Sequence, residues 1–426
     1  MPNTRSIDLF VPGDPKTATG GYIYNAQILA GLAELGWRTR VHSLDDSFPR
    51  PTPSALRDAR AEIAALPGDG VVVIDGLALA GLERVLDTEA KRLPVVALIH
   101  HPLALETGLE PAEARLLETA ERSALALVSR VICTSQWTAR TLATYGVAVD
   151  RIRVVEPGVD RRRWTAHAAV DGLTSRTARA AVESLSRDTP EDHPWGSAPH
   201  IPVRRRSRER LSTSTRAVRR DQSSTPTGAA PDAGRSTPRD VRLLCVATVT
   251  PRKGHAVLLE ALGELRDRRW HLTCAGSTTR DAATFAALEH QVDRLALRAR
   301  VSFLGDLDAD ALEREYERAD LFVLASYLEG YGMALAEAVA RGIPVVSTTA
   351  GAIPETVPAA AGVLVPPGDS RALAKALAPL LDRDDERASL AANARVAASA
   401  LPTWRAAAEK FAAALDGAAP ARGARR

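Results

Sequence analysis

Two glutamates, Glu329 and Glu337, stand eight positions apart across a predicted turn between a strand and a helix. Gly330 and Gly332 lie between them and let the backbone approach a ligand closely. A helix that begins in this turn aims its free N–H groups and the positive end of its dipole at the ligand, which favours a phosphate. If the segment is largely helical, the two carboxylates lie up to ~12 Å apart, too far for one metal ion. The pattern fits a ligand with hydroxyl groups at both ends and phosphates in the middle, which is the layout of a nucleotide sugar.

A basic pair, Arg252 and Lys253, follows another predicted strand and precedes Gly254. Basic side chains at the carboxyl end of a strand can contact a diphosphate. Only 5 of the 55 basic residues are lysines, so composition alone would tend to supply arginine at position 253. The pair therefore indicates a phosphate contact, and the alternative is a surface turn before a helix.

Three weaker signals accompany these motifs. Gly20 and Gly21 follow the first predicted strand, and Lys16 before them is either a phosphate contact or a loop charge. His100 ends a strand of the first half, where an imidazole would face a ligand, and His101 is the second choice. We do not expect the histidine pair to bind a metal, because neighbouring residues on a strand point apart. A purely structural histidine pair remains an alternative.

Residues 306–310 form overlapping D-x-D strings, and such strings can hold a divalent metal with donor phosphates. Asp308 or Asp310 is more simply explained as the cap of the helix that follows. We therefore predict no metal site.

The elements that must position these residues alternate strand and helix, which predicts two parallel, doubly wound α/β sheets with ligands at the carboxyl ends of their strands. The predicted strands are 7–11, 40–43, 71–75, 95–100, 131–134 and 152–155, then 242–247, 271–275, 301–303, 321–325, 345–347 and 363–365. The predicted helices of the first half are 21–35, 53–65, 77–88, 111–129 and 136–145, and a last amphipathic helix covers 402–415.

Composition limits the function class. The chain has 426 residues and a net charge of +3. Residues 165–240 carry 13 Arg and 9 Asp plus Glu, or +4, so the remainder sums to −1, which argues against a nucleic-acid-binding body. That stretch has no hydrophobic period, and we predict that it is a disordered insertion, either a solvated tether or an Arg-rich patch that touches an anionic membrane or a partner.

Cellular location is also predicted from the sequence. No apolar run approaches ~18 residues, and the chain enters a strand almost at once, so we expect no signal peptide. The three cysteines, Cys133, Cys245 and Cys274, lack metal-ligand spacing. They are expected to be buried reduced thiols in a cytoplasmic protein.

The run from Glu329 to Glu355, with R-G-I-P-V-V at 341–346, resembles the E-x7-E segment of retaining glycosyltransferases with the GT-B architecture, and is most similar to family 4, the group 1 glycosyltransferases. The resemblance implies a two-domain enzyme that uses a nucleotide diphosphate sugar, needs no metal or other cofactor, and acts on an unknown acceptor. It implies these segments: an N-terminal Rossmann-like domain at 1–164, the insertion at 165–240, a donor-binding domain at 241–400, a helix at 401–416 that crosses back to the first domain, and a tail at 417–426.

The same resemblance implies roles for individual residues. Glu329 would contact the donor sugar, Glu337 the ribose, and His100 the sugar near its reacting carbon. Arg252 and Lys253 would hold the diphosphate, although Thr248 occupies the position of the usual arginine. The donor-binding set implied is Gly20, Gly21, Gly305, Gly330, Tyr331, Gly332, Met333 and Glu337.

Two other functions stay open at this point. A GT-B phosphorylase or a sugar-nucleotide epimerase would share the fold, although neither lysine of the predicted domain 241–400, Lys253 or Lys375, stands in a Schiff-base context. A non-catalytic nucleotide-sugar-binding protein is the other alternative, and the retained glutamates and basic pair argue against it.

Overall fold

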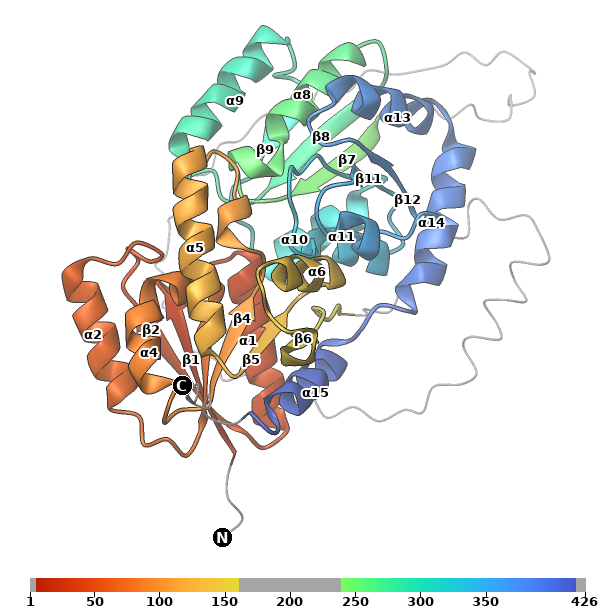
Figure 1. Ribbon diagram of the computed structural model, residues 1–426. Coiled ribbons are helices and arrows are strands. Elements are labelled where there is room, and N and C mark those ends of the chain that lie inside the picture. Colours follow the sequence, from red (N-terminus) through yellow and green to blue (C-terminus); the bar gives the residue numbers. More distant parts are fainter. Residues whose placement is uncertain (1–4, 161–238, 419–426) are drawn as a thin grey trace, which may run out of the picture. The chain divides into compact units, whose positions relative to one another are not determined.

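The computed structural model describes residues 5–160 and 239–418, which lie in one compact unit of the chain. These residues form two parallel sheets of six strands each. Figure 1 shows that helices flank both sheets. The predicted fold class is confirmed. The predicted insertion, 165–240, lies outside the described residues except for its last two positions, and so does most of the predicted tail.

The first sheet has the strand order β2-β1-β3-β4-β5-β6. Its strands are β1 (Ser6–Pro12), β2 (Arg38–Leu44), β3 (Val71–Asp75), β4 (Val95–Ile99), β5 (Arg130–Cys133) and β6 (Ile152–Val154). Its helices are α1 (Gly20–Glu34), α2 (Pro53–Ala64), α3 (Gly76–Leu79), η1 (Ala80–Leu82), α4 (Glu83–Glu89), η2 (Leu103–Leu105), α5 (Pro111–Leu127), α6 (Gln136–Thr144) and η3 (Val149–Arg151). Apolar clusters cover both faces of the sheet, as expected for parallel strands.

The second sheet has the order β12-β11-β10-β7-β8-β9. Its strands are β7 (Val241–Val246), β8 (Trp270–Ala275), β9 (Val301–Phe303), β10 (Leu321–Leu324), β11 (Val345–Thr348) and β12 (Gly362–Val365). Its helices are η5 (Pro251–Lys253), α8 (His255–Glu264), α9 (Ala282–Arg294), α10 (Ala309–Arg318), α11 (Met333–Ala340), α12 (Ile353–Thr356), α13 (Ser370–Asp382) and α14 (Asp384–Ala398). Asp308 caps α10 by accepting a hydrogen bond from the N–H of Ala311 at 2.7 Å, so the predicted cap is confirmed.

Both strand orders contain one point where the direction of winding reverses, between β1 and β3 in the first sheet and between β7 and β10 in the second. Loops on either side of such a point diverge and leave a crevice at the carboxyl ends of the strands. Gly20 and Gly21, the Arg252–Lys253 pair and Glu329 follow three of these strands, and the fourth strand, β3, ends at Asp75, which was not predicted. The topology therefore brings the predicted motifs to the two crevices.

The single helix predicted at 77–88 is wrong, because the chain there forms α3, η1 and α4 in succession. Gly81 lies in the middle, within η1. A Cβ at this position would come within 2.8 Å of Pro51 and 2.9 Å of Phe48. Packing against this neighbouring loop explains the break, and glycine is a weak helix former.

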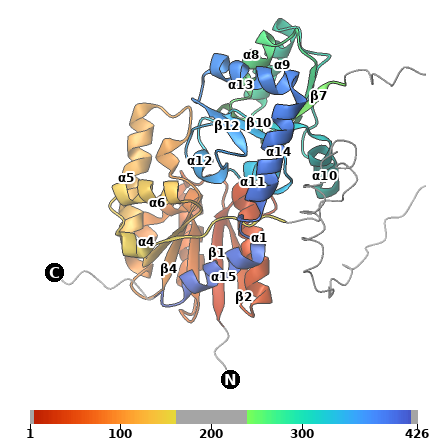
Figure 2. The same ribbon diagram turned by 90° about the vertical axis from the view of Figure 1, so that its right-hand side faces the viewer.

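The last helix, α15 (Trp404–Leu415), packs against α1 of the first half, and Figures 1 and 2 show the two side by side. The chain passes between the halves twice. The first connection begins with residues 155–160 after β6, and the second is residues 399–403 before α15. They touch each other, since Val159 N–H donates to the carbonyl of Pro402 at 2.9 Å. Gly158 lies so close to Trp404 that a Cβ added to Gly158 would be 2.2 Å from the backbone nitrogen of Trp404. No helix within the described residues is long and apolar enough to cross a membrane.

Candidate functional site

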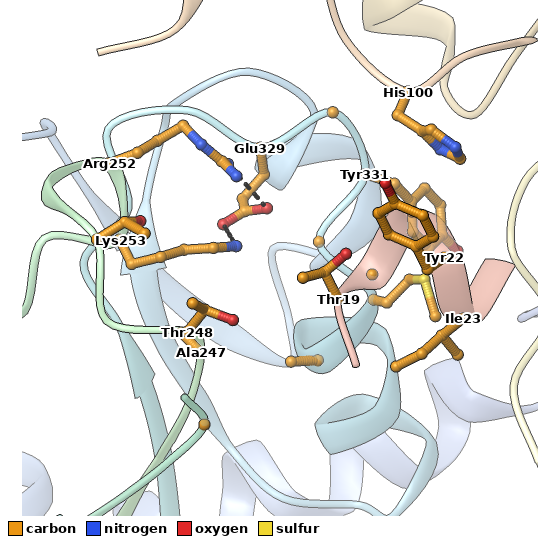
Figure 3. A pocket seen from close by; sticks show the side chains of 18 of the residues that line it. Thr19, Tyr22, Ile23, His100, Ala247, Thr248, Arg252, Lys253, Glu329 and Tyr331 are labelled. Atoms are coloured by element: carbon orange, nitrogen blue, oxygen red, sulfur yellow. Dashed lines mark hydrogen bonds and ion pairs between the residues drawn. The ribbon is translucent and has the colours of Figure 1, made fainter. Parts of the chain in front are cut away.

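A cavity of about 640 Å³ is lined by loops from both sheets. Figure 3 shows Arg252 and Lys253 converging on Glu329, with His100 and Tyr22 on the other side of the space. The predicted site residues that line it are Gly20, Gly21, His100, Arg252, Lys253, Glu329, Gly330, Tyr331, Gly332, Met333 and Glu337. Gly305 and Lys16 are not among the lining residues.

Glu329 is the centre of the charged part of this cavity. Its Oε1 lies 2.6 Å from Nζ of Lys253 and accepts a 2.7 Å hydrogen bond from the hydroxyl of Ser326. Its Oε2 lies 3.7 Å from Nη1 of Arg252. Burial alone would raise the pKa of Glu329, but the charges of Lys253 and Arg252 and the hydrogen bonds from Lys253 and Ser326 outweigh it, so the pKa is lowered. Glu329 is therefore an ionised carboxylate already paired with two cations.

The turn that carries Arg252 and Lys253 is fixed by the residue after it. Gly254 has a φ of +67°, and a Cβ there would lie 2.0 Å from the carbonyl oxygen of Ala325 at the end of β10. Only glycine fits both the left-handed backbone and this close approach. Nη1 of Arg252 also donates to the carbonyl of Leu328 at 2.8 Å, which ties the guanidinium to the neighbouring loop.

Helix α11 points its N-terminus into the cavity, because Gly332, Met333 and Ala334 all line it. Gly332 precedes the helix with a φ of +91°, and no side chain caps the helix here. The first N–H groups are therefore available to an anion. In the second turn, half-buried Glu337 accepts a 2.9 Å hydrogen bond from the hydroxyl of Tyr316. Burial raises the pKa of Glu337 despite the opposing effect of Arg341.

His100 and His101 both line the cavity but have different partners. Nε2 of His100 is buried and makes no hydrogen bond within the described residues, although it lies 3.5 Å from Oδ2 of Asp75. Asp75 is held by Asn25 at 2.9 Å. Its pKa is raised by burial but lowered more by His100, Asn25 and a backbone N–H. His101 instead places Nε2 3.1 Å from Oε2 of Glu106. Of these two histidines, His100 is the one whose buried Nε2 makes no hydrogen bond within the described residues.

Several charged cavity residues were not predicted from the sequence: Asp75, Glu106, Arg280 and Asp281. Asp75 had a readable signal, since it is a lone carboxylate at the end of the apolar strand V-V-V-I-D. Glu106 had none, because a glutamate in a loop is common. Gly305, predicted to bind the donor, does not line the cavity, and its carbonyl accepts a backbone hydrogen bond from Gly276 at 2.8 Å. Gly276 lines the cavity in its place.

The cysteines are free and buried, as predicted. What their spacing did not indicate is that Cys245 and Cys274 pair across β7 and β8 and meet His255 at the start of α8. Their ligand-capable atoms lie within 4.8 Å of one another, with Cys245 Sγ 3.7 Å from His255 Nε2. This group has three ligands, whereas a structural zinc site takes four. It packs beneath the Arg252–Lys253 turn.

Comparison with known proteins gives two family matches. A model described as Glycosyltransferase Family 4 matches residues 7–163. A second, described as Glycosyl transferases group 1, matches residues 231–397. Each half of the chain is thus covered by its own model.

Curated relatives match over part of their length. A D-inositol 3-phosphate glycosyltransferase of Corynebacterium diphtheriae is 36% identical over 167 residues, which is 37% of this chain and 38% of that protein. A GDP-mannose-dependent monoacylated alpha-(1-6)-phosphatidylinositol monomannoside mannosyltransferase of Corynebacterium glutamicum is 31% identical over 171 residues, or 38% and 43% of the two chains. The chain spans less than half the length of the curated relatives it matches.

Solved structures match over almost the whole chain. Sucrose-phosphate synthase from Thermosynechococcus elongatus has a TM-score of 0.69 at 21% identity and covers 96% of this chain and 98% of its own. Anabaena HepE in complex with UDP and glucose has a TM-score of 0.67 at 17% identity and covers 96% and 99%. These similarities establish the two-sheet GT-B fold, and with a family model on each half, the chain belongs to the family 4 (group 1) glycosyltransferases.

Proposed function

We propose that this protein transfers a sugar from a nucleotide diphosphate sugar to an acceptor, with retention of the anomeric configuration and without a metal ion. The observation that carries the proposal is the cluster of Arg252, Lys253 and Glu329, set opposite the uncapped N-terminus of α11 in one cavity. Cations and helix N–H groups on a shared space suit a diphosphate, and a carboxylate beside them suits sugar hydroxyls.

In this proposal the diphosphate leaves toward Arg252, Lys253 and the start of α11. Groups fixed in place before the reaction stabilise developing charge with little reorganisation. Three positive groups around one cavity replace the metal that other glycosyl transfer sites use. Glu337, in the second turn of α11, takes the ribose hydroxyls, and His100 takes a hydroxyl of the sugar near the reacting carbon.

The state of Glu329 supports same-face transfer rather than a covalent sugar intermediate. Its carboxylate is already paired with Lys253 and bonded to Ser326, so it is a poor free nucleophile. We propose that a donor phosphate oxygen takes the proton of the incoming acceptor hydroxyl. The O–H bond of the acceptor breaks as its oxygen bonds to the anomeric carbon, and the nucleoside diphosphate leaves from the same face.

We also propose that the protein is cytoplasmic, which is supported by its free, buried cysteines. We further propose that it contacts the inner membrane face peripherally, which is supported by the +4 charge of residues 165–240. Cell fractionation tests it. Recovery in the membrane fraction that is lost at high salt supports it, whereas secretion contradicts it. The acceptor is left open, since the relatives share less than half of their length with this chain.

The first experiment is a panel of UDP-, GDP- and ADP-sugars, measured by thermal shift and then by release of the nucleoside diphosphate with acceptor extracts. We expect the sugar nucleotides of one base to raise the melting temperature of the protein. The same donors should be turned over at the full rate in the presence of EDTA. NMR of the product should show the donor's anomeric configuration. Binding without turnover in any extract would favour a non-catalytic protein, and inversion or a strict metal requirement would overturn the mechanism.

A further inference from the structure

Glu106 links the two walls of the cavity. Its Oε1 lies 2.9 Å from Nε of Arg252, and its Oε2 lies 3.1 Å from Nε2 of His101. The N–H of Thr107 donates to Oε1 at 3.2 Å. Burial alone would raise the pKa of Glu106, but His101 and Arg252 outweigh it and lower the pKa to about 2. The carboxylate is therefore ionised throughout the physiological range.

The charges on this side of the cavity balance. Lys253 pairs with Glu329, and Arg252 pairs with Glu106 and, at a longer distance, with Glu329. Two cations thus face two carboxylates. A diphosphate that enters this space meets two negative groups already placed on the cations it needs. The two carboxylates weaken its attraction to Arg252 and Lys253, and this opposition falls if one carboxylate gives way.

The two carboxylates differ in how firmly they are held. The Glu329 side chain is 7% exposed, is hydrogen bonded to Ser326 and lies on a backbone packed beneath Gly351. The Glu106 side chain is 37% exposed, and it lies on the loop between η2 and α5, near the open turn at Gly108. The Glu106 carboxylate is already partly hydrated, so it can move into water with less disturbance of buried surroundings than Glu329.

We infer that Glu106 is an internal counter-ion that occupies the anion-binding side of Arg252 in the free protein and is displaced by the diphosphate of the donor. The inference rests on the proposed donor site. Glu106 is a positioning residue, since it acts through Arg252 and not on the sugar. When the nucleoside diphosphate leaves, the carboxylate returns to the guanidinium and opposes rebinding, which lowers product inhibition.

The loop is built so that the side chain can move while its base stays fixed. Glu121 of α5 is buried, and its carboxyl group accepts hydrogen bonds from the N–H groups of Leu103 and Ala104 at 2.9 and 3.4 Å. This anchors the backbone two residues before Glu106. The displaced carboxylate can therefore swing out by side-chain rotation and return to the same place.

The test measures binding of UDP, UMP and uridine to the wild type and to Glu106→Gln by calorimetry, with GDP or ADP derivatives if UDP does not bind. We expect the substitution to tighten nucleoside diphosphate binding about threefold to tenfold, the range of a partly exposed charged contact. Binding of the bare nucleoside should not change. The inhibition constant of the nucleoside diphosphate should fall by the same factor.

Two further variants separate this role from a structural one. Glu110→Gln removes an exposed carboxylate from the same loop and should leave all three affinities unchanged. In an Arg252→Ala background, Glu106→Gln should have no effect on the diphosphate, because the interaction acts only through Arg252.

Weaker or unchanged diphosphate binding by Glu106→Gln, with the wild type still binding, would overturn the inference alone. The inference also fails if the tightening persists without Arg252 or extends equally to the nucleoside. If the wild type binds no nucleoside diphosphate, both the inference and the proposed donor site fail. Thermal melts of each variant show whether a change reflects loss of folding.

Discussion

The two walls of the cavity hold their charges differently. On the second-half wall, the half-buried Lys253 and Arg252 pair with the buried Glu329, and Ser326 and tight glycine turns fix this cluster. On the first-half wall, Glu106 stands on a partly exposed loop whose backbone is anchored by the buried Glu121. A fixed cluster can stabilise charge during reaction, whereas a movable carboxylate can exchange with a ligand. The cavity therefore joins a prearranged side to an adjustable one.

Replacing the lysine of the fixed wall should have the largest effect. Lys253→Met leaves Glu329 buried with only the more distant Arg252 as a counter-charge. Breaking one partner of a buried ion pair costs about 3 kcal/mol of unfolding free energy. Nucleoside diphosphate affinity should fall roughly tenfold to a hundredfold, as for a lost charged hydrogen bond, while affinity for the bare nucleoside is retained.

Lys375→Met is the matched control, since Lys375 is an exposed lysine of α13 in the same half. Denaturant unfolding and calorimetry should find this variant equal to the wild type. Equal losses for nucleoside and diphosphate in Lys253→Met would mean that the fixed wall holds the fold and not the ligand.

Glu121, which anchors the loop of Glu106, should make the free energy of unfolding depend on pH. Burial raises the pKa of Glu121 from 4.5 to about 7. The folded protein therefore keeps a proton that the unfolded chain releases above about pH 4.5, so this group's contribution to stability falls as pH rises from about 4.5 to 7. Glu121→Gln should remove about 2 kcal/mol of that decline, measured by urea unfolding at pH 5 and pH 8. An unchanged pH slope would show that the buried carboxyl group does not titrate in this window.

A smaller effect is expected at the far end of the fixed wall. Glu337 is proposed to hold the ribose, so Glu337→Ala should weaken UDP binding roughly tenfold. The sharper measurement compares UDP with its 2′,3′-dideoxy analogue. The wild type should prefer UDP, and the variant should bind both alike. If the variant keeps the full preference for the ribose hydroxyls, Glu337 has been misassigned.

The smallest effect is expected outside both walls. Replacing residues 166–237 with a short Gly/Ser linker should leave the melting temperature and donor affinity nearly unchanged, because loop-closure entropy varies slowly with length. Use of an acceptor on anionic vesicles should fall at low salt only. A large loss of stability after the replacement would show that this segment belongs to the folded enzyme.

Strands and chemistry-bearing turns were largely predictable because their signals are local. Apolar runs marked the strands, and Glu329 and Lys253 stood in glycine-rich turns directly after two of them. What failed depends on contacts between distant segments. Gly81 breaks a predicted helix because Phe48 and Pro51 pack on it, and Glu106 gains its role only from Arg252, far along the chain. Contacts between residues far apart in the sequence leave no periodic pattern from which they could be predicted.

The connection formed by residues 399–403 has a consequence for how the enzyme tolerates change. Because this short segment joins α14 to α15, and α15 is packed on α1, it holds the two halves together covalently. The effective concentration of one half around the other is set by this tether, not by the longer connection after residue 160. Insertions after residue 160 should therefore have little effect on assembly of the cavity. Insertions within residues 399–403 should be poorly tolerated.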